Sequence, residues 1–356
     1  MIKVGIIGCG LMGALHARTL HKLPGVAVTA LQNRTREKAE LLAAELGGAA
    51  VYDRYEDLLK HDLDAVWVAT PDHLHVDAAI AVLEAGKHLF LEKAIATSVA
   101  DGALIAAAGA KHPELKAMVG YPLRFAPAYR AMKDVVSKED AGKPIQAWSM
   151  RTHFLDPDQR VYDKYRDHYY DTPSWYFDDE TAKGPIFSHG SHDYDLLRWM
   201  CGEIESVFAY GGTYLLPPGS VADAFTVAIK FVNGGIAHVS TPWVTRVEYD
   251  ITGVATEKLT VVNNNGELMF KDDNGPEQRT TFADNDMWVR LNSHFIECVR
   301  DGKEPLISLE DGLRTIAVSE AAYRSLKEGV EVKIEKLDLQ KLQDTQSKAS
   351  SSGAGV

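Results

Sequence analysis

Short apolar runs alternate with helical patterns over the N-terminal third of the chain. The runs predict strands at residues 4–7, 26–31, 65–69, 88–91 and 116–120, and the patterns predict helices at 11–20, about 32–46 and 76–85. Strands that alternate with helices in this way form βαβ units and a parallel sheet. Residues 1–121 are therefore predicted to be an α/β domain.

From residue 121 onward this alternation stops. A helix is predicted at 127–137, a strand at 147–152 and a helix within 184–200, followed by alternating stretches at 207–213, 224–231, 236–242, 247–254, 258–262, 267–270 and 279–282. Turn signals such as Asn233-Gly234-Gly235 separate these stretches, which predicts a large, mostly antiparallel sheet. Helices at 287–301 and 309–328 complete a second domain over 122–337, and the small residues of 338–356 predict a flexible tail.

A glycine-rich turn joins the first strand to the first helix. Gly8, Gly10 and Gly13 have the G-x-G-x-x-G spacing, with Cys9, Leu11 and Met12 between them. This spacing gives a tight turn, close backbone approach to a pyrophosphate and close packing of helix on strand. Because a βαβ unit surrounds the turn, it predicts a dinucleotide-binding site.

The end of the second strand is the place that selects the cofactor. An acidic residue there binds the ribose 2′-hydroxyl of NAD, whereas a nearby arginine accommodates the 2′-phosphate of NADP. Asn33 and Arg34 stand at this position, so NADP is expected in preference to NAD. Stacking of Arg34 on adenine, or exposure to solvent, is the alternative.

Polar residues follow the third and fourth predicted strands. They are Thr70, Pro71, His73 and His75 after one strand and Glu92 and Lys93 after the other. Because ligands bind at the carboxyl ends of strands in an open parallel sheet, these two junctions are expected to flank the nicotinamide. Both histidines also fit the plainer role of loop residues near a helix start.

The segment 153–182 is polar and aromatic and has no clear periodicity. A long loop of this kind is usually functional, and its stacking and hydrogen-bonding side chains suit a polyhydroxylated ligand. A protein interface has a similar composition, and that alternative stays open.

Charge and cysteine content narrow the class of partner. The formal net charge is −12, which argues against a nucleic acid or an anionic membrane as the partner. The three cysteines have no metal-like spacing and predict no disulfide framework, so no metal is expected and a reducing cytoplasm fits. No signal-like N-terminus and no apolar run of membrane length occur, so a soluble protein that is not exported is expected.

Several motifs occur in an order that resembles one family. They are Ala69-Thr70-Pro71 with His73-Leu74-His75, the pair Glu92-Lys93, Tyr121-Pro122-Leu123-Arg124-Phe125 and His192-Asp193-Tyr194-Asp195-Leu196-Leu197-Arg198-Trp199. Together they resemble the glucose–fructose oxidoreductase, inositol dehydrogenase and MocA (Gfo/Idh/MocA) family over about residues 2–335. The resemblance implies an N-terminal Rossmann domain, a C-terminal α+β domain whose open sheet supports homodimers or homotetramers, and oxidation or reduction of a sugar, an inositol or a related small molecule.

The resemblance and the chemistry of hydride transfer together assign roles. A carbinol that loses a hydride needs a group to take its hydroxyl proton and a cation to stabilise the alkoxide, which suits His192 and Lys93. Both match the family's catalytic residues, and Asp195 matches its acid, which either orients the imidazole or caps the helix. A plainer reading makes Lys93 a ribose or phosphate contact and His192 a helix-entry residue.

Departures from the family pattern leave other functions open. Ser188 stands where many members have an aspartate, Ala94 replaces the usual proline, and Trp175-Tyr176 replaces a Trp-Arg pair. His189 is a candidate to substitute for the missing aspartate. A redox-neutral hydrolase or lyase that uses nicotinamide transiently, and a non-catalytic cofactor sensor, are therefore the alternatives to a dehydrogenase.

The predicted site residues fall into three groups. The catalytic residues are Lys93, His192, Asp195 and His189. The cofactor-binding residues are Gly8, Cys9, Gly10, Leu11, Met12, Gly13, Asn33, Arg34, Thr70, Pro71, His73, His75, Glu92, Lys93, Tyr121 and Arg124. The substrate-binding residues are Lys93, Tyr121, Arg151, His153, Tyr170, Trp175, Tyr176, Ser188, His189 and His192.

Overall fold

The computed structural model describes residues 1–337 except for 156–159, 164–167, 172–173 and 284–285. The chain forms two compact units. The first contains Met1–Pro122 and Asp286–Ile316, and the second contains Leu123–Asn285 and Ala317–Glu335. The predicted flexible tail, 338–356, lies outside the described residues.

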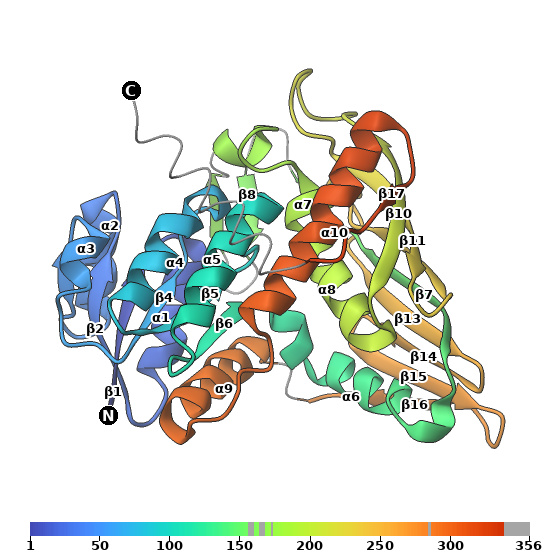
Figure 1. The fold of residues 1–356 in the computed structure, drawn as a ribbon, viewed down its shortest axis with the longest axis horizontal. Coiled ribbons are helices and arrows are strands. Elements are labelled where there is room, and N and C mark those ends of the chain that lie inside the picture. The colour runs from blue at the N-terminus through green and yellow to red at the C-terminus, as the bar shows by residue number, and fades with distance from the viewer. Residues whose placement is uncertain (156–159, 164–167, 172–173, 284–285, 338–356) are drawn as a thin grey trace. The chain divides into compact units, whose positions relative to one another are not determined.

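The first unit is built on a six-stranded sheet (Figure 1). Its strand order is β3-β2-β1-β4-β5-β6 and every pair is parallel. The strands are β1 (Ile2–Ile7), β2 (Val26–Gln32), β3 (Ala50–Tyr52), β4 (Ala65–Val68), β5 (His88–Glu92) and β6 (Ala117–Gly120). The predicted Rossmann-type sheet is confirmed, and only the short, half-buried β3 is absent from the sequence pattern.

Helices connect and cover these strands. They are α1 (Leu11–His21), α2 (Arg36–Glu45), α3 (Tyr55–Leu58), α4 (His75–Glu84), α5 (Val99–Lys111) and α9 (Met287–Asp301), with a 3₁₀ turn η1 (Asp72–Leu74). Helix α9 packs against α1 although the two helices lie far apart in sequence (Figure 1). The predicted second domain, 122–337, is therefore wrong for residues 286–316, because the apolar face of α9 is buried in the first unit.

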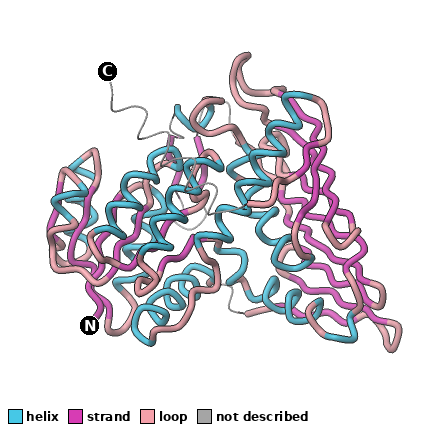
Figure 2. Tube along the Cα trace, in the orientation of Figure 1, coloured by secondary structure: helices cyan, strands magenta, loops and turns pink. Residues whose placement is uncertain are grey.

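The second unit is built on a nine-stranded sheet with the order β16-β15-β14-β13-β7-β12-β11-β10-β17 (Figure 2). The strands are β7 (Pro144–Arg151), β10 (Ile204–Gly212), β11 (Ala224–Phe231), β12 (Ile236–Ser240), β13 (Asp250–Thr256), β14 (Leu259–Asn264), β15 (Glu267–Asp272), β16 (Gln278–Thr281) and β17 (Val332–Lys333). The prediction of a mostly antiparallel sheet is confirmed. The neighbours β7 and β12 pair in parallel.

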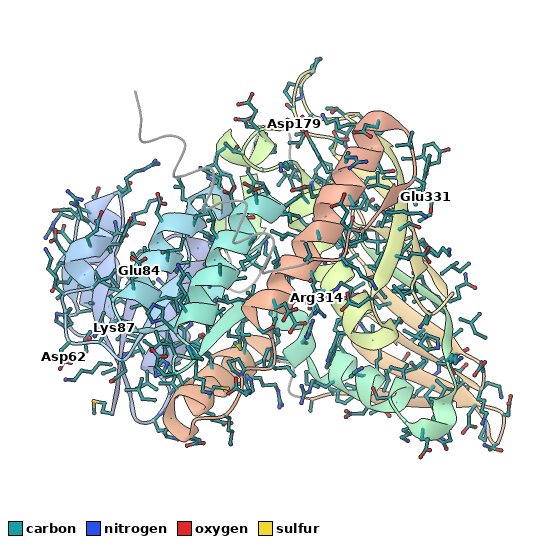
Figure 3. All side chains as sticks on the ribbon, viewed as in Figure 1. Asp62, Glu84, Lys87, Asp179, Arg314 and Glu331 are labelled. Atoms are coloured by element: carbon teal, nitrogen blue, oxygen red, sulfur yellow. The ribbon has the colours of Figure 1, made fainter. Side chains whose placement is uncertain are left out.

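The remaining described elements are helices, short 3₁₀ turns and one hairpin. They are α6 (Pro127–Val136), α7 (Pro185–Ser188), α8 (Gly190–Cys201) and α10 (Leu309–Glu328), with 3₁₀ turns η2 (Pro122–Phe125), η3 (Glu139–Ala141) and η4 (Ser174–Phe177) and a hairpin of β8 (Arg160–Asp163) and β9 (His168–Asp171). Near η4, Asp179 accepts hydrogen bonds from Tyr323 (2.8 Å) and Lys327 (2.6 Å) of α10 (Figure 3). These bonds fix the segment after η4 on α10. None of the described helices is both long enough and apolar enough to cross a membrane.

Candidate active site

The glycine turn lies where the strand order of the first sheet reverses, between β1 and β4. Gly8 has a φ of +90°, and a Cβ on it would lie 2.6 Å from the carbonyl oxygen of Ala69 after β4. A Cβ on Gly13 would lie 1.8 Å from the carbonyl oxygen of Gly8. Both positions require glycine, because a side chain would force strand, turn and helix apart.

Gly10 differs, because a Cβ there would meet no atom within 4 Å. It is the N-cap of α1, and neither a side-chain cap nor an acidic residue in the first turn neutralises this helix end. An open backbone at a helix N-terminus is suited to a phosphate group. The residues of the turn therefore fit the pyrophosphate of a dinucleotide.

The residues predicted to select the cofactor have different environments. The amide oxygen of Asn33 accepts a hydrogen bond from the Cys9 backbone N–H (2.9 Å), and its nitrogen donates to the Thr35 carbonyl (2.9 Å). Asn33 thus braces the glycine turn, whereas the neighbouring Arg34 is exposed. Burial raises the pKa of the Cys9 thiol to about 12, so its role in the turn is as a neutral group.

The two strand-end segments, 70–75 and 92–95, hold the remaining predicted cofactor residues of the first unit except Tyr121. Thr70, Pro71 and His73 are half-buried, whereas His75 is fully buried and bonds to backbone on both sides of its ring. Lys93 is half-buried, directly after the buried Glu92, and a cis peptide bond joins it to Ala94. Tyr121, at the end of β6, is fully buried. Thr70, Pro71, His73, Glu92, Lys93 and Tyr121 stay predicted ligand contacts, whereas both ring nitrogens of His75 face backbone carbonyl oxygens.

In the second unit, Asp195 forms a buried ion pair with Arg124. The guanidinium donates two hydrogen bonds to the carboxylate, at 2.8 and 2.6 Å. Both side chains are buried, and the guanidinium also lies 5.6 Å from the ring centroid of Trp199. Asp195 does not cap α8, because His189 is at the N-cap. Asp195 and Arg124 thus bind each other within this unit, and the catalytic role of Asp195 and the cofactor role of Arg124 stay predictions.

A second buried ion pair links α8 to β7. Arg151 donates to both carboxylate oxygens of Asp193, each at 2.8 Å, and to the carbonyl oxygen of His189 at 3.2 Å. Burial lowers the pKa of Arg151, but the charge and hydrogen bonds of Asp193 outweigh it and raise the pKa overall. Arg151 is a predicted substrate contact, whereas the motif gives Asp193 no predicted role, although it adjoins His192.

We expect Asp193→Asn to lower the free energy of unfolding by about 3 kcal/mol, because it leaves a buried guanidinium without its counter-ion. Urea unfolding followed by circular dichroism measures this change. As a control, Glu205→Gln removes the exposed pair with Lys230 (3.0 Å) and should cost less than about 1 kcal/mol. Equal costs for the two variants would contradict the structural role of Asp193.

His189 lies in a cluster of rings in the second unit. The indole N–H of Trp243 donates to His189 Nδ1 (3.0 Å), and the His153 ring centroid lies 5.1 Å from that of His189. An indole nitrogen only donates, so Nδ1 is the acceptor and Nε2 carries the ring proton. His189 therefore presents a hydrogen-bond donor at Nε2.

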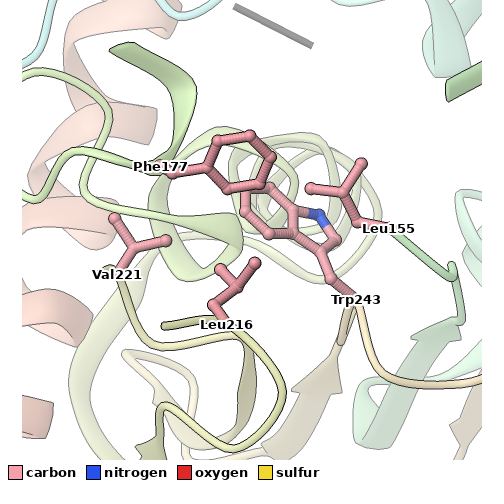
Figure 4. Close-up of a cluster of buried hydrophobic side chains, with 5 residues drawn as sticks. All are labelled: Leu155, Phe177, Leu216, Val221 and Trp243. Atoms are coloured by element: carbon pink, nitrogen blue, oxygen red, sulfur yellow. The ribbon is translucent and has the colours of Figure 1, made fainter. Parts of the chain in front are cut away.

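Trp243 is the buried member of this ring cluster. Its ring stacks on Tyr176 (5.1 Å between centroids, 20° between planes) and also packs in a cluster of buried apolar side chains. Figure 4 shows these apolar neighbours: Leu155, Phe177, Leu216 and Val221. Trp243 is not among the predicted site residues, because it follows β12 with no motif around it.

The other predicted substrate residues of the second unit lie near the start of α8, on η4 or on β9. His192 is half-buried in the first turn of α8, and the hydroxyl of Ser188, at the end of α7, donates to the Gly184 carbonyl (3.1 Å). Trp175 and Tyr176 are half-buried on η4. Tyr170 lies on β9, and its side chain is outside the part of the structure that is described.

Sequence models of one family match both parts of the chain. Residues 2–121 match the oxidoreductase family model with an NAD-binding Rossmann fold. Residues 129–269 match the GFO/IDH/MocA C-terminal domain.

Individual relatives extend over nearly the whole chain. The scyllo-inositol 2-dehydrogenase (NAD(+)) of Bacillus subtilis is 28% identical, over 94% of this chain and 96% of its own. The myo-inositol 2-dehydrogenase of Thermotoga maritima is 24% identical, over 94% of this chain and 99% of its own. Among solved structures, levoglucosan dehydrogenase in complex with NADH and levoglucosan has the same fold, with a TM-score of 0.84 at 20% identity, covering 94% of this chain and 100% of its own. The chain belongs to the Gfo/Idh/MocA family of NAD-binding oxidoreductases.

Proposed function

We propose that this protein is an NAD(P)-dependent dehydrogenase for a polyhydroxylated small molecule, either an inositol, a sugar or a derivative of one. The observation that carries the proposal is the glycine turn, closed at Gly8 and Gly13 and open at Gly10, at the switch point of a parallel sheet. The inositol dehydrogenases among the full-length relatives support this substrate class.

The proposed reaction needs a proton acceptor and a positive charge. A bound nicotinamide supplies the hydride acceptor for oxidation. We assign proton transfer from the substrate hydroxyl to His192 and stabilisation of the developing alkoxide to Lys93. Imidazole titrates near neutral pH and ammonium carries a compact charge, which suits each to its role.

The ring cluster of the second unit supplies the proposed substrate contacts. With its proton on Nε2, His189 is proposed to donate a hydrogen bond to a substrate oxygen rather than to accept a proton. The half-buried ring of Tyr176 offers an apolar face of the kind that packs on the C–H face of a sugar or cyclitol, and the buried ring of Trp243 stacks against it. Discrimination among polyols then depends on which hydroxyls find partners.

For the cofactor, we propose that Arg34 accommodates a 2′-phosphate and that NADP is favoured. The side chain of Asn33 is engaged in the glycine turn, and the exposed Arg34 follows it directly. The name of the Bacillus subtilis relative specifies NAD(+). A comparison of NADPH and NADH binding by this protein therefore tests the proposed preference.

Arg34→Glu is expected to weaken NADPH binding by at least about tenfold, or about 1.4 kcal/mol, and to change NADH binding by less. Fluorescence titration with both reduced cofactors measures this. Lys60→Glu, on an exposed lysine paired with Asp57, makes the same charge change elsewhere in the first unit and should leave both affinities unchanged. Tighter binding of NADH by the parent protein would contradict the proposed role of Arg34.

We also propose that the protein is a homodimer or homotetramer joined through the sheet of the second unit. Tyr210 of β10 and Ile236 of β12 are exposed apolar side chains on this sheet. Light scattering after size-exclusion chromatography measures the oligomeric state, and a monomer would contradict this proposal.

The activity itself is tested with a panel of inositol isomers, aldoses and anhydrosugars, each supplied with NAD or NADP. Formation of reduced nicotinamide with at least one panel compound supports the proposal. No turnover with tight cofactor binding would instead favour a cofactor sensor.

A further inference from the structure

Two fully buried histidines hold the residues on either side of Lys93. His16 of α1 bonds to the side chain of Glu92, and His75 of α4 bonds to the backbone of Ala94. The sequence pattern predicts neither contact. It gives His16 no role at all and makes His75 a cofactor contact.

The first of these contacts is a buried hydrogen bond between His16 and Glu92. His16 Nε2 lies 2.7 Å from Oε1 of Glu92, and both side chains are buried. The other oxygen of Glu92 accepts the Lys93 backbone N–H at 3.2 Å. His16 is therefore connected to the Lys93 backbone through one carboxylate.

A residue of helix α9, Asn292, determines that His16 donates from Nδ1. His16 Nδ1 lies 3.0 Å from Oδ1 of Asn292, which also accepts the Trp67 indole N–H (3.0 Å). The amide nitrogen of Asn292 donates to the Trp288 carbonyl (2.9 Å), so Oδ1 is an acceptor. Nδ1 therefore carries a proton, and a second proton lies between Nε2 and Glu92.

The charge balance of this pair follows from the two protons. An imidazole protonated at Nδ1 and sharing a further proton with one carboxylate carries no net charge as a pair. A neutral pair can be buried, whereas an unpaired carboxylate in the same place would be strongly disfavoured. His16 thus stabilises Glu92 in the position that binds the Lys93 amide.

The second contact joins the two strand-end segments of the first unit. His75 Nδ1 lies 2.8 Å from the Ala94 carbonyl oxygen, and Nε2 lies 2.9 Å from the Thr70 carbonyl oxygen. Each ring nitrogen donates to its carbonyl when protonated. Both bonds form together when the ring is doubly protonated, and in that form one side chain links the segment after β4 to the residue that follows Lys93.

We infer that His16 and His75 are positioning residues that clamp the backbone of Lys93 from both sides. This inference rests on the role of Lys93 in the proposed function. A lysine on a flexible four-carbon stem is placed only as accurately as its backbone, and misplacement by about 1 Å can cost about a hundredfold in rate. The clamp sets that backbone with groups that touch neither substrate nor hydride.

The test compares three variants with the full-length parent. His16→Leu and His75→Leu each remove one side of the clamp, and His75→Gln retains a single amide nitrogen as the N–H donor for the Ala94 carbonyl oxygen. His294→Leu is the matched control, since His294 accepts the Leu306 backbone N–H (2.9 Å) in the same unit but lies outside the clamp. Two measurements are made on each: backbone hydrogen exchange of the peptide spanning 91–96, and kcat with the best compound of the polyol panel.

We expect His16→Leu and His75→Leu to raise exchange of that peptide at least about tenfold and to lower kcat about a hundredfold, with the Kd of NADH within about twofold of the parent. His75→Gln should recover most of the kcat lost in His75→Leu, and His294→Leu should leave both readouts near the parent. Loss of NADH binding in parallel with kcat would indicate general damage and overturn the positioning role, as would unchanged exchange or unchanged kcat.

Failure of the proposed function would look different. If no panel compound turns over, or if Lys93→Met turns over normally, the assignment of Lys93 fails. The exchange measurement does not need turnover, so it still decides whether the two histidines hold this segment.

Discussion

Lys93→Met is expected to lower kcat/KM by about 10²–10⁴-fold, while the protein still folds and binds NADH. Methionine keeps an unbranched apolar stem but has no charge, so the alkoxide that forms as the hydride leaves loses its stabilising cation. Steady-state kinetics with the best panel compound, and fluorescence titration with NADH, separate the chemical step from cofactor binding.

Lys87→Met is the matched control for this variant. Lys87 lies before β5, at the opposite end of that strand from Lys93, and donates to the Leu63 carbonyl oxygen at 2.7 Å. Its loss should change kcat/KM by less than about twofold, since surface substitutions away from a site have small effects. Normal turnover by Lys93→Met would show that Lys93 is only a ribose or phosphate contact.

Gly13→Ala is expected to destabilise the first unit by more than about 4 kcal/mol and to abolish cofactor binding. Its Cβ would lie 1.8 Å from the Gly8 carbonyl oxygen, which is backbone and cannot rotate away. Helix α1 would have to move off the turn, and the pyrophosphate site would be lost with it. Thermal unfolding and NADH titration measure the two effects.

Gly10→Ala separates these effects, because its Cβ meets no protein atom within 4 Å. The melting temperature should stay close to that of the parent, while NADH binding weakens by at least about tenfold, since the methyl group occupies the space left for phosphate. If Gly10→Ala binds NADH as tightly as the parent, the pyrophosphate does not approach the turn there.

Local patterns predict the elements of this fold well. The helices predicted at 287–301 and 309–328 have the observed bounds, since long amphipathic patterns between clear stop signals leave little choice. The unit to which α9 belongs is not predictable in this way. Its packing on α1 joins segments separated by most of the chain, and no local pattern carries that information.

The sequence predicts the parts of the candidate site in which a motif determines the backbone conformation. It does not predict which side chains form hydrogen bonds with each other. Gly8 and Gly13 are needed for steric reasons, so the glycine spacing together with the surrounding βαβ pattern identifies the turn. Asn33 and Asp195 are predicted as ligand or catalytic groups, yet each has a hydrogen-bond partner within its own unit. Trp243 has no motif, because its role depends on a ring, His189, that is distant in sequence.

The most direct test of the proposed activity is a parallel count of reduced nicotinamide formed and polyol consumed, with the purified protein and excess NADP or NAD. A dehydrogenase with the proposed site forms one reduced nicotinamide for each polyol consumed, so we expect equal amounts of the two and an oxidised polyol as the product. Consumption of a glycoside with no net change in nicotinamide would contradict this activity, and would identify a redox-neutral hydrolase or lyase instead.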